Sequence, residues 1–225
     1  MSREIIYKQM NSKSLFITFE GIEGCGKSTQ LQLLKEFFRG KGEFITTREP
    51  AGTLIGMQIR NILANSKNKG MDGLTEFLLL SAARKQHVEE VLKPAIQSGK
   101  WIFCDRFADS SFAYQCRGRG VDEEIINQIT LIATGGIKPD ITFLLDVPVE
   151  VGISRIKNRA MKLERIELET FDFFERVRSG YLELVRREPD RVKLVNGTMD
   201  IKEVHEQILD KIFKYLNELE RNSRT

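Results

Sequence analysis

Short runs of apolar and β-branched residues recur along the chain, and segments with helical periodicity separate them. Strands that are buried on both faces of a sheet have this continuous apolar character. Regular alternation of strands and helices indicates an α/β fold with a five-stranded parallel sheet and helices on both faces. The predicted strands are Leu15–Glu20, Glu43–Thr47, Trp101–Asp105, Ile141–Asp146 and Val192–Asn196.

The longest helical pattern covers Leu74–Gln97 and ends before Ser98 and Gly99, which are typical of a helix C-terminus. Ligands of open α/β sheets bind at the carboxyl ends of the strands. The loops after residues 20, 48, 105, 146 and 196 are therefore expected to converge on one site. We predict further helices over Ser28–Phe38, Thr53–Ala64, Asp122–Ala133, Val149–Asn158, Glu169–Arg187 and Ile201–Leu219.

The loop after the first predicted strand contains the strongest motif in the chain. Residues 21–28 read GIEGCGKS, which matches the GxxxxGK[ST] phosphate-binding loop between a strand and a helix. Its backbone N–H groups and the Lys27 ammonium would bind phosphates, and the Ser28 hydroxyl would bind Mg²⁺. The N-terminus of the next helix adds positive potential. We expect nucleotide phosphates to bind Gly21, Ile22, Glu23, Gly24, Cys25, Gly26, Lys27, Ser28 and Thr29.

Length and charge limit the remaining possibilities. A chain of 225 residues that is 41% hydrophobic is long enough for one domain, which we place at residues 13–225 with a short lid at about 155–167. Residues 1–12 are expected to form a flexible tail. The 35 basic and 32 acidic residues give a formal charge of +3, so neither nucleic acid nor a membrane is expected as a partner.

The cysteines and histidines carry little chemistry in this pattern. Cys25, Cys104 and Cys116 are odd in number and lack metal-site spacing, which favours free thiols in a reducing compartment. The N-terminus has charged residues and no long apolar run, so we expect a cytoplasmic protein. His87 and His205 lie in helical patterns and are expected on the surface.

Two strand ends offer a carboxylate for Mg²⁺. Asp105 ends the apolar strand WIFCD, and Asp146 ends FLLLD. Such a carboxylate commonly holds Mg²⁺ beside a phosphate loop. Asp105 is preferred because its neighbour Arg106 would contact a second phosphate, whereas Val147 and Pro148 follow Asp146.

Two further features favour phosphoryl transfer between two ligands over hydrolysis or switching. Glu23 lies inside the phosphate loop, where a carboxylate is unfavourable unless it faces a neutral hydroxyl group of another ligand. The loop has no arginine, and phosphoryl transfer requires positive charge at the transferring group. A basic segment between two predicted helices would supply it through Arg155, Lys157, Arg159, Lys162 and Arg165.

These motifs together resemble the thymidylate kinases of bacteria. The resemblance runs from about Ser14 to the C-terminal helix. It implies a P-loop nucleoside monophosphate kinase architecture and Mg²⁺-dependent transfer of the ATP γ-phosphoryl group to dTMP, which gives dTDP and ADP in dTTP biosynthesis. It also implies a homodimer. The motifs are GIEGCGKST, TREPAGT, DRFADSSFAYQ, RGRG, PDITFLLDV and RIELETFDFF.

The resemblance implies roles on the nucleotide-donor side and at the transferring group. Lys27 and Ser28 match the residues for phosphate and Mg²⁺, and Asp105 matches the carboxylate near the metal. Arg159 matches the lid arginine of members whose loop lacks a basic residue, and Arg155 and Arg165 are the alternatives. The expected catalytic residues are Lys27, Asp105, Arg106 and Arg159.

The resemblance also implies an acceptor site. Glu23 matches the acid that contacts the sugar 3′-hydroxyl, and Arg106 matches the contact with the acceptor phosphate. Arg84 matches the arginine that binds a thymine carbonyl, and Tyr114 matches the tyrosine that crowds the 2′ position. Ser111 and Gln115 lie where the family reads the base edge and lines the deoxyribose pocket.

One acceptor position departs from the family pattern. Leu80 stands where an aromatic residue commonly stacks on thymine, and its effect on acceptor range is open. Phe77, one turn earlier, is expected to add a ring edge to the base pocket. In the TREPAGT segment, Ala51 replaces a common glycine.

Two alternatives stay open. The first is a kinase of the same fold that phosphorylates another nucleoside monophosphate or a deoxynucleoside. The second is a nucleotide-dependent regulatory switch. A guanine-reading NKxD motif is absent, since the segment from Asn68 to Met71 lacks the acid, so ATP is the expected donor. We expect its adenine near Asn196, Gly197 and Thr198.

Overall fold

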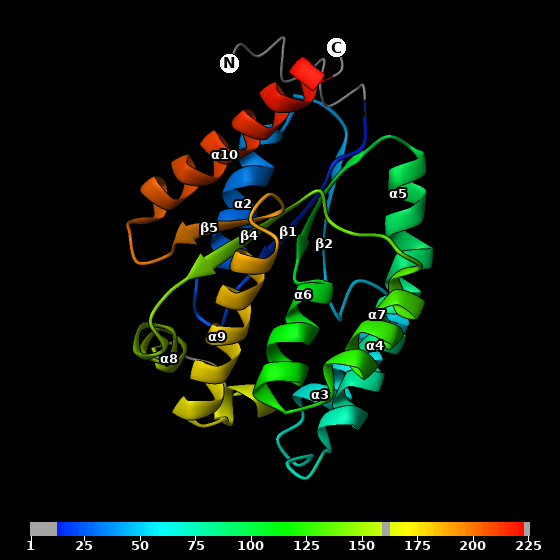
Figure 1. Ribbon diagram of the computed structural model, residues 1–225, viewed down its shortest axis with the longest axis vertical. Coiled ribbons are helices and arrows are strands. Elements are labelled where there is room, and N and C mark those ends of the chain that lie inside the picture. The colour runs from blue at the N-terminus through cyan, green and yellow to red at the C-terminus, as the bar shows by residue number, and fades with distance from the viewer. Residues whose placement is uncertain (1–12, 159–162, 223–225) are drawn as a thin grey trace.

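The computed structural model describes residues 13–158 and 163–222, and a parallel five-stranded sheet forms its centre (Figure 1). The strand order is β2-β3-β1-β4-β5. All paired strands are parallel, which confirms the predicted α/β fold. The strands are β1 (Phe16–Glu20), β2 (Phe44–Arg48), β3 (Trp101–Asp105), β4 (Ile141–Asp146) and β5 (Val192–Asn196).

Helices cover both faces of the sheet (Figure 1). The α-helices are α2 (Lys27–Phe38), α3 (Leu54–Ala64), α4 (Gly73–His87), α5 (Lys93–Gln97), α6 (Ala108–Ser111), α7 (Glu123–Thr134), α8 (Val149–Lys157), α9 (Phe171–Arg187) and α10 (Ile201–Asn222). Two π-helical segments, η1 (Val88–Leu92) and η2 (Phe112–Gly118), and one 3₁₀ turn, η3 (Arg165–Leu168), complete the helical elements of the described residues.

Alternating side chains of the central strand face opposite helical layers. Ile17 lies beside Phe103 of β3, whose ring packs on Phe38 of α2, and α2 in turn packs against α10. Glu20 points to the other face and meets Tyr181 of α9. The central strand β1 thus presents Ile17 to one helical layer and the polar Glu20 to the other.

The segment that follows β3 differs from the sequence prediction. It was expected as a loop but forms α6 and η2 without interruption. Helix η2 packs closely on α9 because Gly118 and Gly180 lie at the contact. A Cβ at Gly118 would come within 2.8 Å of the Phe173 ring, and one at Gly180 within 2.9 Å of Arg117 Cγ. Tertiary packing therefore stabilises helix where local sequence gives a weak signal.

The predicted helix Leu74–Gln97 is present as a continuous run of α4, η1 and α5. The π-helical segment η1 lies in its middle. Val88 and Leu92 of η1 are fully buried on the sheet beside α5. Insertions of this kind are often found near functional sites, and α4 carries Arg84 one turn before η1.

His87 is buried, so the prediction that it lies on the surface is wrong. Its Nδ1 is 3.2 Å from Glu49 Oε1, and its Nε2 is 2.8 Å from Thr47 Oγ1. Helical periodicity did not show that α4 packs on the loop after β2. His205 is partly buried beside the Phe37 ring, and burial lowers its pKa.

Other sequence predictions concern thiols, membranes and the chain ends. Cys25, Cys104 and Cys116 are free and buried. Across residues 13–158 and 163–222, no helix combines the length and apolar character needed to cross a bilayer. The predicted N-terminal tail, residues 1–12, and the lid residues Arg159 and Lys162 lie outside the described residues.

Candidate functional site

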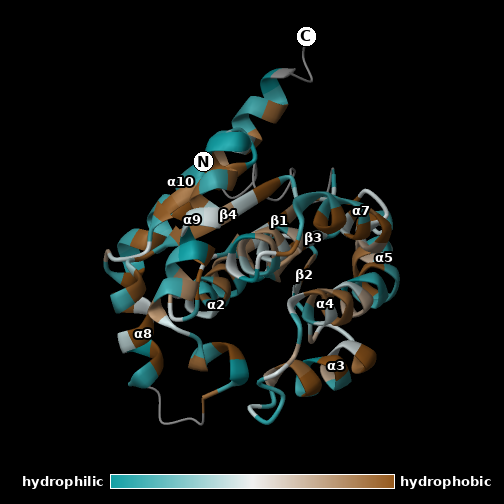
Figure 2. Ribbon diagram, turned by 60° about the horizontal axis from the view of Figure 1, so that its bottom comes forward, coloured by the Kyte–Doolittle hydropathy of each residue, from teal (hydrophilic) through white to brown (hydrophobic). Residues whose placement is uncertain are grey.

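A cavity of about 690 Å³ lies at the carboxyl ends of the strands. Its lining includes Gly24 after β1, Glu49 after β2, Arg106 after β3 and Gly197 after β5. Four of the five predicted loops therefore converge on this cavity, as the α/β topology predicts, whereas residues 146–148 at the end of β4 do not line it. Figure 2 shows α2, α3, α4 and α8 around this end of the sheet.

The phosphate loop joins β1 to α2 and closely approaches α8. Gly24 has φ +74°, and a Cβ there would lie 2.4 Å from the carbonyl oxygen of Gly152 in α8. Only glycine fits both restrictions. The Lys27 ammonium donates to the carbonyl oxygens of Gly21 at 3.1 Å and Ile22 at 3.0 Å. The cavity lining contains Glu23 to Thr29 of the predicted loop, but neither Gly21 nor Ile22.

Asp105 and Ser28 form a pair of oxygen ligands suited to Mg²⁺. Ser28 Oγ donates to Asp105 Oδ2 at 3.2 Å, and the buried Asp105 Oδ1 has no hydrogen-bond partner. Within residues 13–158 and 163–222, no group of three or more His, Cys, Asp or Glu side chains could hold a metal ion. A magnesium ion with few protein ligands is typical of phosphate-bound Mg²⁺, so this pair fits the ion.

The competing carboxylate, Asp146, is engaged elsewhere. Its two oxygens accept hydrogen bonds from Arg178 of α9 at 2.7 and 2.8 Å. Asp146 is also absent from the cavity lining. The geometry favours Asp105 as the carboxylate near the metal.

Glu23 faces the side of the cavity opposite the loop backbone. Its Oε1 accepts from Arg106 Nη2 at 2.9 Å, and its Oε2 accepts from the Tyr114 hydroxyl at 2.6 Å. Tyr114 also accepts from Arg106 Nη2 at 3.0 Å. The structure thus brings together three residues that the sequence assigned to the acceptor. Arg106 has a left-handed backbone with φ +68°, which is uncommon outside glycine.

Arg84 of α4 also lines the cavity, and three partners hold its guanidinium group. Its Nε donates to Glu49 Oε2 at 2.8 Å, and its Nη1 donates to Ser111 Oγ at 2.9 Å. Nη2 donates to the Phe107 carbonyl at 3.0 Å. Such buried charge-assisted hydrogen bonds fix the guanidinium orientation. Sequence reasoning gave Glu49 no role, although it lies in the TREPAGT motif.

Glu76 collects three hydrogen bonds beneath the same side of the cavity. It accepts from Gln115 at 2.7 Å, from Arg165 at 2.6 Å and from Arg119 at 3.1 Å. Arg165 also donates to the Leu63 carbonyl at 2.8 Å. The Arg165 guanidinium is therefore buried in an ion pair, which disfavours it as the arginine that reaches a transferring phosphate.

Of the two other arginines predicted to reach a transferring phosphate, only Arg155 lies among the described residues. Arg155 donates to the carbonyl oxygens of Gly24 at 3.3 Å and Gly197 at 3.2 Å, on the phosphate-loop side. Arg159 lies outside the described residues, so its predicted role stays a prediction.

The two apolar candidates for the base pocket differ. Leu80 lines the cavity on α4, whereas Phe77 is fully buried in the hydrophobic core and does not line it. The predicted ring edge of Phe77 in the base pocket is not supported by this arrangement. The helix turns Phe77 toward the core because residues three positions apart differ by about 60° around the axis.

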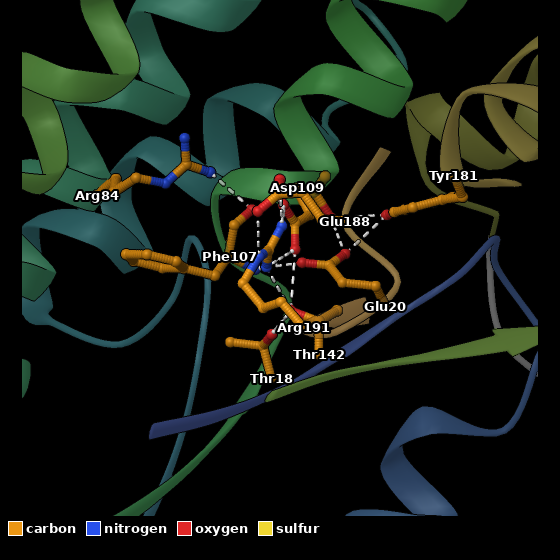
Figure 3. A network of polar contacts seen from close by, with 10 residues as sticks. Thr18, Glu20, Arg84, Phe107, Asp109, Thr142, Tyr181, Glu188 and Arg191 are labelled. Carbon is orange, nitrogen blue, oxygen red and sulfur yellow. Dashed lines mark hydrogen bonds and ion pairs between the residues drawn. The ribbon is translucent and has the colours of Figure 1, made fainter. Parts of the chain in front are cut away.

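A buried polar network that sequence reasoning missed lies beside Arg106, under the cavity (Figure 3). Glu20 is fully buried and accepts hydrogen bonds from the hydroxyl groups of Ser110 at 2.6 Å and Tyr181 at 2.8 Å. Burial raises the pKa of Glu20 to about 7, and the Asp109 charge contributes to the rise. In the sequence, the only indication of this network was that Glu20, a carboxylate, ends an apolar strand. Tyr181, far along the chain, gave none.

The same network ties α6 to the sheet. Arg191 donates to Asp109 at 2.7 and 2.9 Å and to Thr142 at 2.8 Å, and Thr142 is 2.8 Å from Thr18 across β4 and β1. Asp109 therefore lies in an ion pair that helps to place α6 against the strands. Helix α6 begins two residues after Arg106.

The phosphate loop lies at the carboxyl end of a parallel sheet, and Arg84 and Arg106 line the same cavity, an arrangement that fits a P-loop kinase. The family model described as thymidylate kinase matches residues 19–208. The chain belongs to the thymidylate kinase family.

Individual relatives agree with this assignment. A thymidylate kinase of Kosmotoga olearia is 44% identical over 206 residues, which are 91% of this chain and 98% of the relative. One of Citrifermentans bemidjiense is 48% identical over 194 residues, 84% of this chain and 86% of the relative. The crystal structure of thymidylate kinase from Ehrlichia chaffeensis matches with a TM-score of 0.74 and 33% identity, covering 89% of this chain and 99% of that one.

Proposed function

We propose that the protein transfers the γ-phosphoryl group of ATP to dTMP and produces dTDP and ADP, a step toward dTTP. The observation that carries this proposal is the position of Glu23. It belongs to the phosphate loop, yet both carboxylate oxygens bind acceptor-side residues, Arg106 and Tyr114. A donor site and an acceptor site therefore meet at this residue, as direct transfer requires.

The donor side is formed by the loop, α2 and the segment after β5. The loop N–H groups and the N-terminus of α2 favour phosphate charge. Lys27 would leave its contacts with Gly21 and Ile22 to follow the terminal phosphates. Gly197 lines the cavity after β5 and supports an adenine site there, whereas Asn196 and Thr198 do not line it.

Mg²⁺ would be held by Ser28 and Asp105 beside the ATP phosphates. The partnerless Asp105 Oδ1 and the neighbouring Ser28 hydroxyl support this assignment. When bound, the ion neutralises phosphate charge. Ser28 and Asp105 orient these oxygen ligands from two separate elements, the start of α2 and the end of β3.

The acceptor side would bind dTMP along its length. Arg84 would donate to the thymine, with Ser111 and Gln115 near the base edge and Leu80 against its face. Tyr114 would crowd the 2′ position, Glu23 would accept from the 3′-hydroxyl, and Arg106 would bind the phosphate. Closure of the lid would bring Arg159 to the transferring group.

A direct rate comparison tests the proposed acceptor. ADP release is measured with dTMP, dUMP, UMP, CMP, AMP and thymidine under the same ATP and Mg²⁺ concentrations. We expect dTMP to give the highest kcat/KM by a wide margin. Another acceptor of equal efficiency would refute the substrate assignment, and ATP turnover that no acceptor stimulates would favour a regulatory switch.

The exposed apolar side chains support a homodimer. Helix α4 packs against α3 and α7. These three helices carry eight of the thirteen large hydrophobic side chains exposed in residues 13–158 and 163–222. Hydrophobic colouring is evident along α3 in Figure 2. Grouped exposed hydrophobic side chains mark association surfaces, and a second copy of the chain would cover this surface.

A cytoplasmic location remains part of the proposal.

A further inference from the structure

Arg106 is held on two sides by hydroxyl groups that are themselves bound to carboxylates. Its Nη2 donates to Glu23 and Tyr114, which face the cavity. Its Nη1 donates to Tyr181 at 3.0 Å and to Ser110 at 3.2 Å. Of the second pair, Ser110 also lines the cavity, whereas Tyr181 is buried beside Glu20.

The hydroxyl groups of Ser110 and Tyr181 have a defined orientation because of Glu20. Ser110 Oγ and the Tyr181 hydroxyl both donate to the same atom, Glu20 Oε2, at 2.6 and 2.8 Å. An ionised carboxylate only accepts hydrogen bonds, and each hydroxyl has one hydrogen. The two hydroxyl oxygens also lie 2.8 Å apart, but an ionised carboxylate is a stronger acceptor than a neutral hydroxyl. Both hydrogens are therefore directed at Glu20, and both hydroxyl oxygens present lone pairs to Arg106.

Glu20 also fixes the backbone beside Arg106. Its Oε1 accepts from the N–H of Phe107 at 2.7 Å, and Arg106 N–H donates to the Phe19 carbonyl at 3.0 Å. These two bonds flank the residue with φ +68°. Strained backbone persists where the surroundings over-determine it. One buried carboxylate thus constrains both the backbone and the side chain of Arg106.

We propose that Glu20 is a positioning residue for the acceptor phosphate, because it orients Ser110 and Tyr181 so that they hold the Arg106 guanidinium at the phosphate position. The proposal deepens the proposed function and rests on the assignment of Arg106 to the dTMP phosphate. Glu20 itself would touch neither substrate. Its effect would reach dTMP through two hydroxyl groups and one guanidinium.

The test compares binding of dTMP with binding of thymidine, which lacks the phosphate. Calorimetry is performed at about pH 8, above the raised pKa of Glu20, so that the carboxylate is ionised. Tyr181→Phe removes one of the two hydroxyl groups. Glu20→Gln introduces an amide N–H donor, which can reverse the direction of the hydrogen bond with Ser110. We expect each variant to weaken dTMP binding about tenfold and to leave thymidine binding unchanged.

Two comparisons isolate the route through Arg106. In an Arg106→Lys background, Tyr181→Phe should have little further effect on dTMP affinity, since the guanidinium that it positions is gone. Tyr215→Phe removes the hydroxyl of a partly buried tyrosine on α10, outside the cavity lining, and should not change dTMP affinity.

The outcomes separate the two levels of the proposal. If Arg106→Lys leaves dTMP affinity unchanged, the assignment of Arg106 to the phosphate fails. If Arg106→Lys weakens dTMP binding but Tyr181→Phe leaves it unchanged, or weakens thymidine equally, the positioning role is refuted while the proposed function stands. Tyr181→Phe deletes a single oxygen, so it decides the question even if Glu20→Gln does not fold.

Discussion

At the scale of single residues, two aspartates at strand ends have different surroundings. Asp105 lies beside Ser28 with one oxygen lacking a partner, whereas both oxygens of Asp146 bind Arg178. A carboxylate already bound by an arginine has little capacity left for a cation. The local contacts therefore separate two positions that look alike in the sequence.

Asp105→Asn is expected to raise the Mg²⁺ concentration for half-maximal activity by about 10- to 100-fold. The reason is the loss of a charged oxygen beside the metal. The measurement is the initial rate as a function of free Mg²⁺ at saturating ATP and dTMP.

Asp146→Asn is the matched control. It weakens the pair with Arg178 and should lower stability by about 1 kcal/mol without changing the Mg²⁺ requirement. A similar shift in both variants, or none in Asp105→Asn, would contradict the assignment of the metal ligand.

Residues with a defined chemical motif could be placed from the sequence, and residues that support them could not. Glu23, Arg106 and Tyr114 meet within hydrogen-bonding distance, as the resemblance suggested. Glu20 was predicted as the end of a strand, and Tyr181 only as part of the helix Glu169–Arg187. Their contact spans 161 positions, and no local pattern encodes such a pair.

At the scale of elements, the close packing of the phosphate loop on α8 depends on Gly152, which lies outside the GIEGCGKS motif. Gly152 of α8 is buried against the loop, and a Cβ there would lie 2.7 Å from the Glu23 carbonyl and 2.9 Å from Ile22 Cδ1. Helix α8 and the loop can therefore approach only while both Gly24 and Gly152 lack side chains.

Gly152→Ala is expected to destabilise the protein by about 1 to 3 kcal/mol and to raise the KM for ATP. A loss of stability would be informative, because alanine in an isolated helix is more favourable than glycine by about 1 kcal/mol. Chemical denaturation and initial rates with varied ATP measure the two effects.

Gly70→Ala provides the comparison. A Cβ at Gly70 meets no atom within 4 Å, and its φ lies outside the left-handed region. This variant should be as stable as the parent chain, with an unchanged KM for ATP. If Gly152→Ala behaved like Gly70→Ala, steric contact between α8 and the loop would not limit this position.

Strong periodic elements could be predicted, and those created by packing could not. All five strands and the long helices lie within a few residues of their predicted positions. Helices α6 and η2 were missed because their sequence has weak apolar periodicity and forms helix against α9. The burial of His87 was missed for the same reason, since it depends on contact with Thr47 of β2 and with Glu49, which follows β2.

At the scale of the whole molecule, Glu20 links stability to pH. Its pKa is raised from an ordinary value of 4.5 to about 7, first by burial and then by Asp109, while Arg106 opposes the rise. Between these two values the unfolded chain has released the proton and the folded chain retains it. The folded state binds more protons, so the free energy of unfolding falls as pH increases.

We expect this contribution to be fully present below about pH 4.5 and to be lost as pH rises through about 7. Across this interval, the free energy of unfolding of the parent chain should fall by on the order of 2 kcal/mol relative to that of Glu20→Gln. Urea denaturation of both proteins at several pH values measures the difference. A difference that stays constant with pH would show that Glu20 has an ordinary pKa in the folded protein.

The proposed homodimer would form through the exposed apolar side chains of α3, α4 and α7. Leu131 on α7 is 63% exposed, so Leu131→Asp should fold but place a charge within the proposed dimer surface. We expect the parent chain to sediment at twice the 25.9 kDa of one chain, and the variant to dissociate at micromolar concentration. Leu194→Asp on β5, where the leucine is 44% exposed on another element, should remain dimeric. Sedimentation equilibrium distinguishes these states. A monomeric parent chain would refute the dimer, and equal dissociation of both variants would place the interface elsewhere.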